Sequence, residues 1–447
     1  MSGPTSVRIR SYNVGFGDCF LLSFRYAAGS DRHVLVDFGS TKLPSRGPRS
    51  IKAVAERIAE DCDGKLHVVA VTHRHADHMS GFDGASGKVI AALEPDLVIQ
   101  PWTEDPDLDP DATTPAADAD GGGGGGGGGV PAARARARAG ALPAARAITT
   151  RLAEMDAVAR MVRRAAGRPT AAARMSPALA EELHFLGETN IKNEGAVRNL
   201  MTMGKRRVYA RFGTRLPIAT LLPGIDITVL GPPTAEQAPG MARLASRDAQ
   251  EYWHLAASMA RRSSASDQRR LFPAVDEVPV PQPARWLVPQ LDRMNAEESL
   301  AIVRAIDDAL NNTSLILLFD VGGTKLLFPG DAQIENWRYA LYEAPDAAAI
   351  RTSLSGTAVY KVGHHGSLNG TPKTVWYGFD RRGGPEVEPR LQTMISTMSG
   401  KHGKASRGTE VPRRKLMEAL DAESHVWTTH TLRNTGSTRD VELDLPG

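Results

Sequence analysis

Three histidines and one aspartate follow a short apolar stretch, and no other part of the chain limits its fold and chemistry as strongly. Residues 68–71 (Val-Val-Ala-Val) are apolar and mostly β-branched, which predicts a buried strand. The next residues carry His73, His75, Asp77 and His78. Imidazole and carboxylate groups are ligands for zinc, iron and manganese, and burying them without a metal is costly. The stretch therefore predicts a metal site at the end of a strand.

The spacing of these residues indicates how they would divide between metals. His73 and His75 are two positions apart, so an extended backbone points both side chains to the same side, where they can share one ion. Asp77 and His78 follow where the chain turns and can reach a second ion. The alternative is a solvated histidine-rich loop, and the density of ligand types favours the metal site.

The run from Thr72 to His78 resembles the H-x-H-x-D-H signature of the metallo-β-lactamase superfamily. The resemblance implies an α/β (α+β) fold, the four-layer αββα sandwich of these hydrolases, with one or two zinc ions or manganese as an alternative. Residues 13–18, 36–39 and 221–232 are similar to further superfamily segments, and the last range predicts strand, turn and strand. In the family, the aspartate that matches Asp37 supports the ligand loop. Turn chemistry is the alternative for Asp37 and Asp18, and for Asp18 we favour it.

Two later strand ends complete the ligand set that the resemblance implies. Asp331 follows a predicted strand and matches the bridging aspartate of the family, with a helix cap as the alternative. The sequence Gly-His-His-Gly-Ser at 363–367 follows another strand. The matching makes His364 a metal ligand and gives His365 a catalytic role, in which it either supports a ligand or faces the substrate, with a solvated turn as the alternative for both. The full assignment is as follows: metal ligands His73, His75, Asp77, His78, Asp331 and His364; catalytic residues Asp77 and His365; supporting residues Asp37, Thr72 and Ser367.

One ligand of the superfamily has no clear counterpart. Many members carry another metal histidine between the first loop and the bridging aspartate, and here only His184 and His254 lie in that interval. Neither follows a predicted strand, so we favour solvated helix positions for both. One metal site is then expected to hold extra water, which favours manganese or a single zinc.

A finer resemblance suggests the substrate. Residues 13–18, 311–315, 330–332 and 363–367 look like the hydrolase domain of ComEC-type DNA-uptake proteins, which implies nuclease or phosphodiesterase activity. This chain differs from them in lacking a membrane channel and in reading Thr-Glu-Val-Pro at 409–412 and Thr-His at 429–430.

The expected reaction is hydrolysis of an ester-like bond. A bound metal lowers the pKa of its water to about 7, so a metal-bound hydroxide can attack without an activated serine or cysteine. A phosphodiester is the first expectation, in nucleic acid or another molecule. The alternatives are a lactam, lactone or thioester hydrolase and a metal-bound interaction module with little catalysis.

Composition and periodicity divide the chain into six parts. Residues 101–143 are rich in Asp, Pro, Gly and Arg and cannot bury enough apolar surface to fold, so they predict a disordered insertion. A protein partner for that insertion has no support in the sequence. The expected parts are the first half of the hydrolase domain (1–100), the disordered insertion (101–143), a helical insertion (144–214), a return to the domain (215–233), a second insertion and possible lid (234–295) and the second half (296–447).

Bulk properties set the remaining expectations. The net charge of +3 over 447 residues is only weakly basic and does not indicate nucleic acid by itself. Two cysteines make no disulfide framework, which favours a reducing compartment. The first ten residues contain no apolar signal region, and the longest apolar runs are strand-sized. We therefore expect a cytoplasmic protein without membrane insertion.

Overall fold

The computed structural model describes residues 3–45, 47–48, 50–106, 114–115, 194–234, 236–238, 310–367, 370–401, 410–432 and 438–445. Most of the two predicted insertions, at 101–143 and 234–295, lies outside these ranges. Periodic apolar residues predict a helix at 144–166 and another at 296–310. The first of these, nearly all of the second, and both His184 and His254 also lie outside the described ranges.

The first sheet has seven strands, in the order β13-β1-β2-β3-β4-β5-β6. Its β13, β1, β2 and β3 pair antiparallel, whereas β3, β4, β5 and β6 pair parallel. The strands are β1 (Ser6–Tyr12), β2 (Cys19–Arg25), β3 (Arg32–Phe38), β4 (Val68–Ala70), β5 (Leu97–Pro101), β6 (Arg206–Ala210) and β13 (Thr438–Asp444).

The second sheet has six strands, in the order β12-β11-β10-β9-β8-β7. It is antiparallel from β7 to β9 and parallel from β9 to β12. The strands are β7 (Ile225–Gly231), β8 (Ile316–Val321), β9 (Thr324–Phe328), β10 (Thr357–Lys361), β11 (Gln392–Ile395) and β12 (His425–Thr428).

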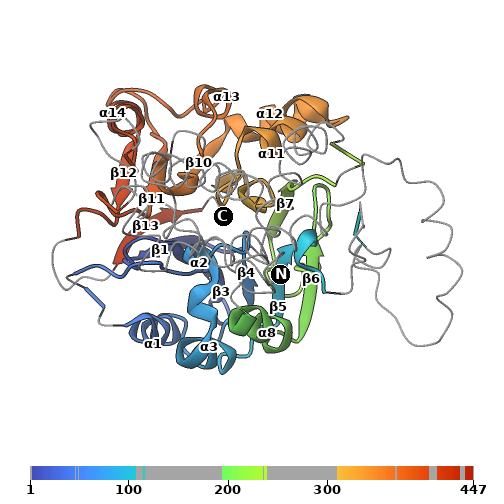
Figure 1. The fold of residues 1–447 in the computed structure, drawn as a ribbon. Coiled ribbons are helices and arrows are strands. Elements are labelled where there is room, and N and C mark those ends of the chain that lie inside the picture. Colours follow the sequence, from blue (N-terminus) through green and yellow to red (C-terminus); the bar gives the residue numbers. More distant parts are fainter. Residues whose placement is uncertain are drawn as a thin grey trace, which may run out of the picture.

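One apolar core joins the two sheets, and helices cover their other faces. The shared core contains Phe20 and Val36 of the first sheet and Phe319 and Phe328 of the second. Figure 1 shows the strands between two sets of helices. On the first sheet lie α1 (Ile51–Asp61), α3 (Gly84–Ala91) and α8 (Glu194–Met203); on the second lie α11 (Ile334–Arg338), the π-helix η5 (Tyr339–Glu343), α12 (Ala347–Ser355), α13 (Lys373–Tyr377) and α14 (Arg414–Glu423).

The short strand β4 illustrates why these residues form this arrangement. Val68 and Ala70 contribute to the core between the sheets, and Val69 contributes to the core under α1 and α3. A strand alternates its side chains between two faces, so a strand buried on both faces must be apolar throughout. The polar residues that follow can lie only beyond the strand end, where the chain enters the ligand loop.

Local signals placed several elements correctly. Ser50 caps α1, and its hydroxyl accepts a hydrogen bond from the Ala53 N–H at 3.1 Å, as expected for this residue type. The chain tail forms the edge strand β13. Within the described part of the chain, no helix combines the length and the apolar character needed to cross a bilayer.

Two expectations about chain organisation are wrong. Residues 221–232 contain one strand, β7, preceded by turns, rather than strand, turn and strand. The expected helical insertion at 144–214 ends too late, because α8 packs on the first sheet and β6 pairs with β5 as the edge strand of that sheet. A β5–β6 pairing joins segments that are far apart in sequence, and no local pattern reports it.

Candidate metal centre

The ligand loop begins directly after β4 and ends in a short helix. His73 and His75 lie in the loop, and Asp77 and His78 lie in α2 (Ala76–Met79), which continues into the 3-10 helix η1 (Ser80–Phe82). All four side chains are buried. The loop also meets the second sheet, because the Thr72 carbonyl accepts a hydrogen bond from the Leu315 N–H at 2.8 Å. This hydrogen bond ties Thr72, at the start of the ligand loop, to the residue that precedes β8 of the second sheet.

Asp37 and Thr72 fix the orientation of two of these histidines. Asp37 Oδ1 accepts the Thr72 N–H at 2.7 Å, and its Oδ2 accepts both the Thr72 hydroxyl and His78 Nδ1–H at 2.8 Å. Because the Thr72 hydroxyl proton goes to Asp37, the oxygen is left to accept His73 Nδ1–H at 3.1 Å. Both histidines therefore present Nε2 to the interior. This is the arrangement that metal-ligating histidines use.

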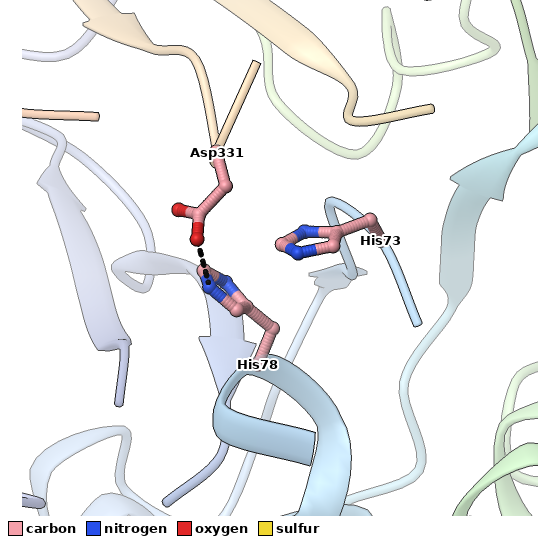
Figure 2. Close-up of side chains that lie close together, drawn as sticks. All are labelled: His73, His78 and Asp331. Atoms are coloured by element: carbon pink, nitrogen blue, oxygen red, sulfur yellow. Dashed lines mark ion pairs between the residues drawn. The ribbon is translucent and has the colours of Figure 1, made fainter. Parts of the chain in front are cut away.

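Asp331 reaches this group from the second sheet. It follows β9, and its Oδ2 lies 3.1 Å from His78 Nε2 as an ion pair (Figure 2). His73, His78 and Asp331 offer three ligand atoms that all lie within 4.8 Å of one another. His75 joins the same group through its Nδ1, which is 2.9 Å from His73 Nε2. His73 and His75, which the sequence assigned to one metal, therefore lie at one place together with His78 and Asp331.

A glycine allows the two halves to approach so closely. Gly330 has a φ of 55°, and a Cβ added to it would lie 2.7 Å from the Thr72 Cβ. No side chain fits at that distance, and the left-handed backbone independently favours glycine. The contact places Asp331, the next residue, directly over the ligand loop.

His365 belongs to the second group of ligand atoms. Its Nε2 lies 3.0 Å from Asp77 Oδ2, and its Nδ1–H donates to the Ser396 carbonyl at 3.0 Å. Asp77, His78 and His365 again place their ligand atoms within 4.8 Å of one another. The sequence had assigned His364 to this role. His364 is 24% exposed and its Nε2 is 4.0 Å from Asp331 Oδ2, so it lies at the margin of the cluster.

A sharp bend in the backbone turns the second histidine of the pair, His365, toward the cluster. His364 and His365 both have left-handed conformations, with φ of 47° and 51°, and Gly366 continues with 82°. Each non-glycine residue in this region costs roughly 1–3 kcal/mol, and such strain persists where the surroundings impose it. The sharp bend turns His365 into the buried cluster, and it could not be deduced from two adjacent histidines in a sequence.

Two further charged residues complete the cluster, and the sequence argument missed both as site residues. Asp18 is fully buried and forms an ion pair with Lys361 of β10, instead of acting only as a turn residue. The sequence did contain a signal for this ion pair, namely a lysine inside the apolar strand 358–362. Lysine is almost never buried unless it is paired. Ser367, expected to support the site, has a hydroxyl without a hydrogen-bond partner among the described residues.

The electrostatics of the cluster favour positive charge. Burial alone would lower the pKa of His365, but Asp18 and Asp331 raise it to about 10. For His78, Asp331 and Asp37 likewise outweigh burial and raise the pKa well above its usual value. His73 faces mainly other histidines, so burial and then His78 hold its pKa well below the usual value. The protein thus provides one neutral imidazole beside a set of carboxylates that attract cations.

The residues present fit a divalent metal. Asp77 Oδ1 is buried and has no hydrogen-bond partner in the part of the chain that the structure describes. An ionised oxygen left in that state is costly, and a metal ion would satisfy it. The donor set of imidazoles and carboxylates suits zinc and also manganese.

Comparison with known proteins adds no assignment to this geometry. No family model matches the chain, and no curated protein matches it. The chemistry of the cluster itself therefore carries the functional argument.

Proposed function

We propose that the chain is a metal-dependent hydrolase with the metallo-β-lactamase fold. The two sheets that share one core, with helices on both outer faces, support the four-layer αββα arrangement of that superfamily. One observation carries the proposal: the loops after β4, β9 and β10 bring buried histidines and aspartates to a single cluster. Such a convergence has no evident role in stability, because its carboxylates and imidazoles are partly unpaired without an ion.

We assign the ligands from their placement. His73, His78 and Asp331, with His75 beside His73, would form one set of ligands, and Asp77, His78 and His365 would form a second set that shares His78. His365 takes the place that the sequence gave to His364. Zinc is the first choice and manganese the alternative, with one or two ions bound.

The chain's own residues prepare the site for hydrolysis. When bound, a divalent metal makes water more acidic, toward a pKa of about 7, and polarises an ester-type oxygen. Asp37 and the Ser396 carbonyl accept Nδ1–H of His78 and His365, which leaves Nε2 of each ring as the nitrogen that would ligate a metal in place of its proton. His364, part-exposed beside Asp331, would be the histidine that contacts a substrate oxygen.

A phosphodiester is the proposed substrate class. The support is the resemblance of residues 13–18, 311–315, 330–332 and 363–367 to ComEC-type hydrolase domains, several of whose residues lie in this cluster. These include Asp18, Asp331 and His365.

The test combines metal analysis with substrate assays. Elemental analysis of the purified protein should give one or two equivalents of zinc or manganese. The loaded protein should then cleave single- or double-stranded DNA, RNA or bis(p-nitrophenyl) phosphate. Bound metal without turnover on any phosphodiester would defeat the nuclease proposal, and turnover on lactams, lactones or thioesters instead would move the substrate to that class. Turnover on neither would favour an interaction module.

A further inference from the structure

A buried lysine connects the two halves of the cluster without being one of its ligands. Lys361 lies in β10 and is only 2% exposed. Its ammonium group forms an ion pair with Asp18, donates to the Gly330 carbonyl at 3.1 Å and lies 3.5 Å from Asp331 Oδ1. An ammonium group has three donors, and here three oxygens surround it.

Asp18 belongs to the first sheet's side of the cluster. It lies in the turn between β1 and β2, its N–H donates to the Asp77 carbonyl at 2.9 Å, and its own carbonyl accepts the Gly39 N–H at 3.0 Å. Its Oδ1 lies 3.4 Å from His365 Nδ1. The backbone of Asp18 is therefore fixed to the ligand helix α2, and its side chain reaches Lys361 and His365, which belong to the second sheet and the loop after it.

The oxygens around Lys361 consequently come from segments attached to both sheets. Asp18 is anchored beside Asp77, whereas Gly330 and Asp331 follow β9 of the second sheet. Lys361 and the His364 N–H, at 3.1 Å, engage Oδ1 of Asp331, which leaves Oδ2 to face His78. A movement of one half against the other would separate the ammonium group from part of its shell, and burial makes that loss expensive.

We propose that the Lys361–Asp18 ion pair is the positioning device that sets Asp331 and His365 at coordinating distance from the ligands of the first sheet. Lys361 contacts neither substrate nor metal and acts through these two residues. The inference rests on the metal site of the proposed function. It extends that function by naming what aligns ligands carried by two different sheets.

The main test is Asp18→Asn, which keeps an oxygen acceptor of the same size but removes the charge. The matched control is Asp96→Asn, which weakens the ion pairs with Lys65 and Lys205, at 3.0 and 2.7 Å, before β5 and away from the cluster. Apo-protein is titrated with zinc against a chelator and with cobalt(II), whose absorption spectrum reports coordination geometry. We expect Asp18→Asn to bind zinc about 10–100-fold more weakly, with altered cobalt bands, as for other groups that support metal ligands. Asp96→Asn should match the wild type in both.

A second variant guards against simple loss of folding. Lys361→Met together with Asp18→Asn removes both charges, and such neutral replacements of buried ion pairs often leave stability unchanged. We expect it to remain folded without metal and to show the same weaker binding.

The outcomes separate this inference from the proposed function. If wild-type protein binds neither zinc nor cobalt, the metal site itself is wrong. If the wild type binds and both variants keep its affinity and spectrum, only the positioning role is overturned. If both variants fail to fold as apo-protein, the pair serves stability instead, which also overturns the proposal.

Discussion

Two pairs of buried histidines lie at opposite ends of β4, and only one of them belongs to the candidate metal centre. His67 directly precedes β4 and His33 lies beside it in β3, at 6% and 4% exposure, whereas His73 and His78 follow β4 and are fully buried. Burial therefore does not distinguish the two pairs. Their neighbours do.

The first pair is satisfied without any anion. His33 contacts the Ser23 hydroxyl at 3.0 Å, His67 Nδ1 accepts the His33 N–H at 3.1 Å, and His67 Nε2 lies 3.3 Å from Arg32. Burial and then Arg32 lower the pKa of His67 to about 4. At the other end, carboxylates raise the pKa of His78 and His365. The comparison teaches that carboxylate neighbours, rather than buried imidazoles, distinguish the candidate metal centre from an ordinary buried pair.

The largest effect is expected from His78→Ala, set against His67→Asn as the matched control. His78 contributes to both groups of ligand atoms, so its loss should reduce phosphodiesterase kcat/KM by about 1000-fold or more, with loss of bound metal. Asp77→Ala should behave similarly. His67→Asn should retain full activity. Circular dichroism checks that each variant is folded, and full turnover by His78→Ala would remove this residue from the site.

A smaller effect separates the two adjacent histidines. His365→Ala should lower kcat/KM by about 100-fold and reduce metal content, because His365 is a buried partner of Asp77. His364→Ala should lower kcat/KM by about 10-fold with metal content unchanged, the cost expected of one lost substrate contact. Steady-state kinetics and elemental analysis on both variants decide the matter. The reverse ranking would restore the assignment made from the sequence.

Metal removal tests the same comparison through stability. Adding zinc at 100 times its dissociation constant should raise the free energy of unfolding of apo-protein by about 2.7 kcal/mol, because the ion binds only the folded chain. His67→Asn should show the same increment and His78→Ala almost none. Chemical denaturation with and without zinc measures it. An undiminished increment in His78→Ala would place the ion elsewhere.

The smallest effect concerns pH and the pair outside the centre. The folded-state pKa of His67, about 4, lies below its ordinary value of 6.5, so the unfolded chain takes up a proton first. This contribution to stability is complete above pH 6.5 and is lost as the pH falls toward 4. Between pH 7 and pH 5 the wild type should lose about 1 kcal/mol more than His67→Asn, after allowance for partial solvent screening. Denaturation of both apo-proteins at the two pH values measures the difference, and parallel curves would contradict it.

Local sequence signals were reliable for single elements. The apolar run before the ligand loop is β4, the Ser50 cap starts α1, and Asp331 follows β9 as expected. They failed where a partner was distant. The pairing of β6 with β5, the ion pair of Asp18 with Lys361 and the inward turn of His365 all depend on residues more than 100 positions away or on a strained bend.

The sequence by itself determined which residues of ligand type follow which apolar strands, because residue types and hydrophobic period can be read along the chain. Only the tertiary structure decided which ligands meet. Strands from two sheets pack on one core, and that packing aligns the ends of β4, β9 and β10. The tertiary structure also decided which neighbours each buried histidine has. Those neighbours determine whether the pKa of the imidazole is lowered, as in His67, or raised by carboxylates, as in His78. Long-range packing sets these contacts, and a one-dimensional pattern carries no record of them.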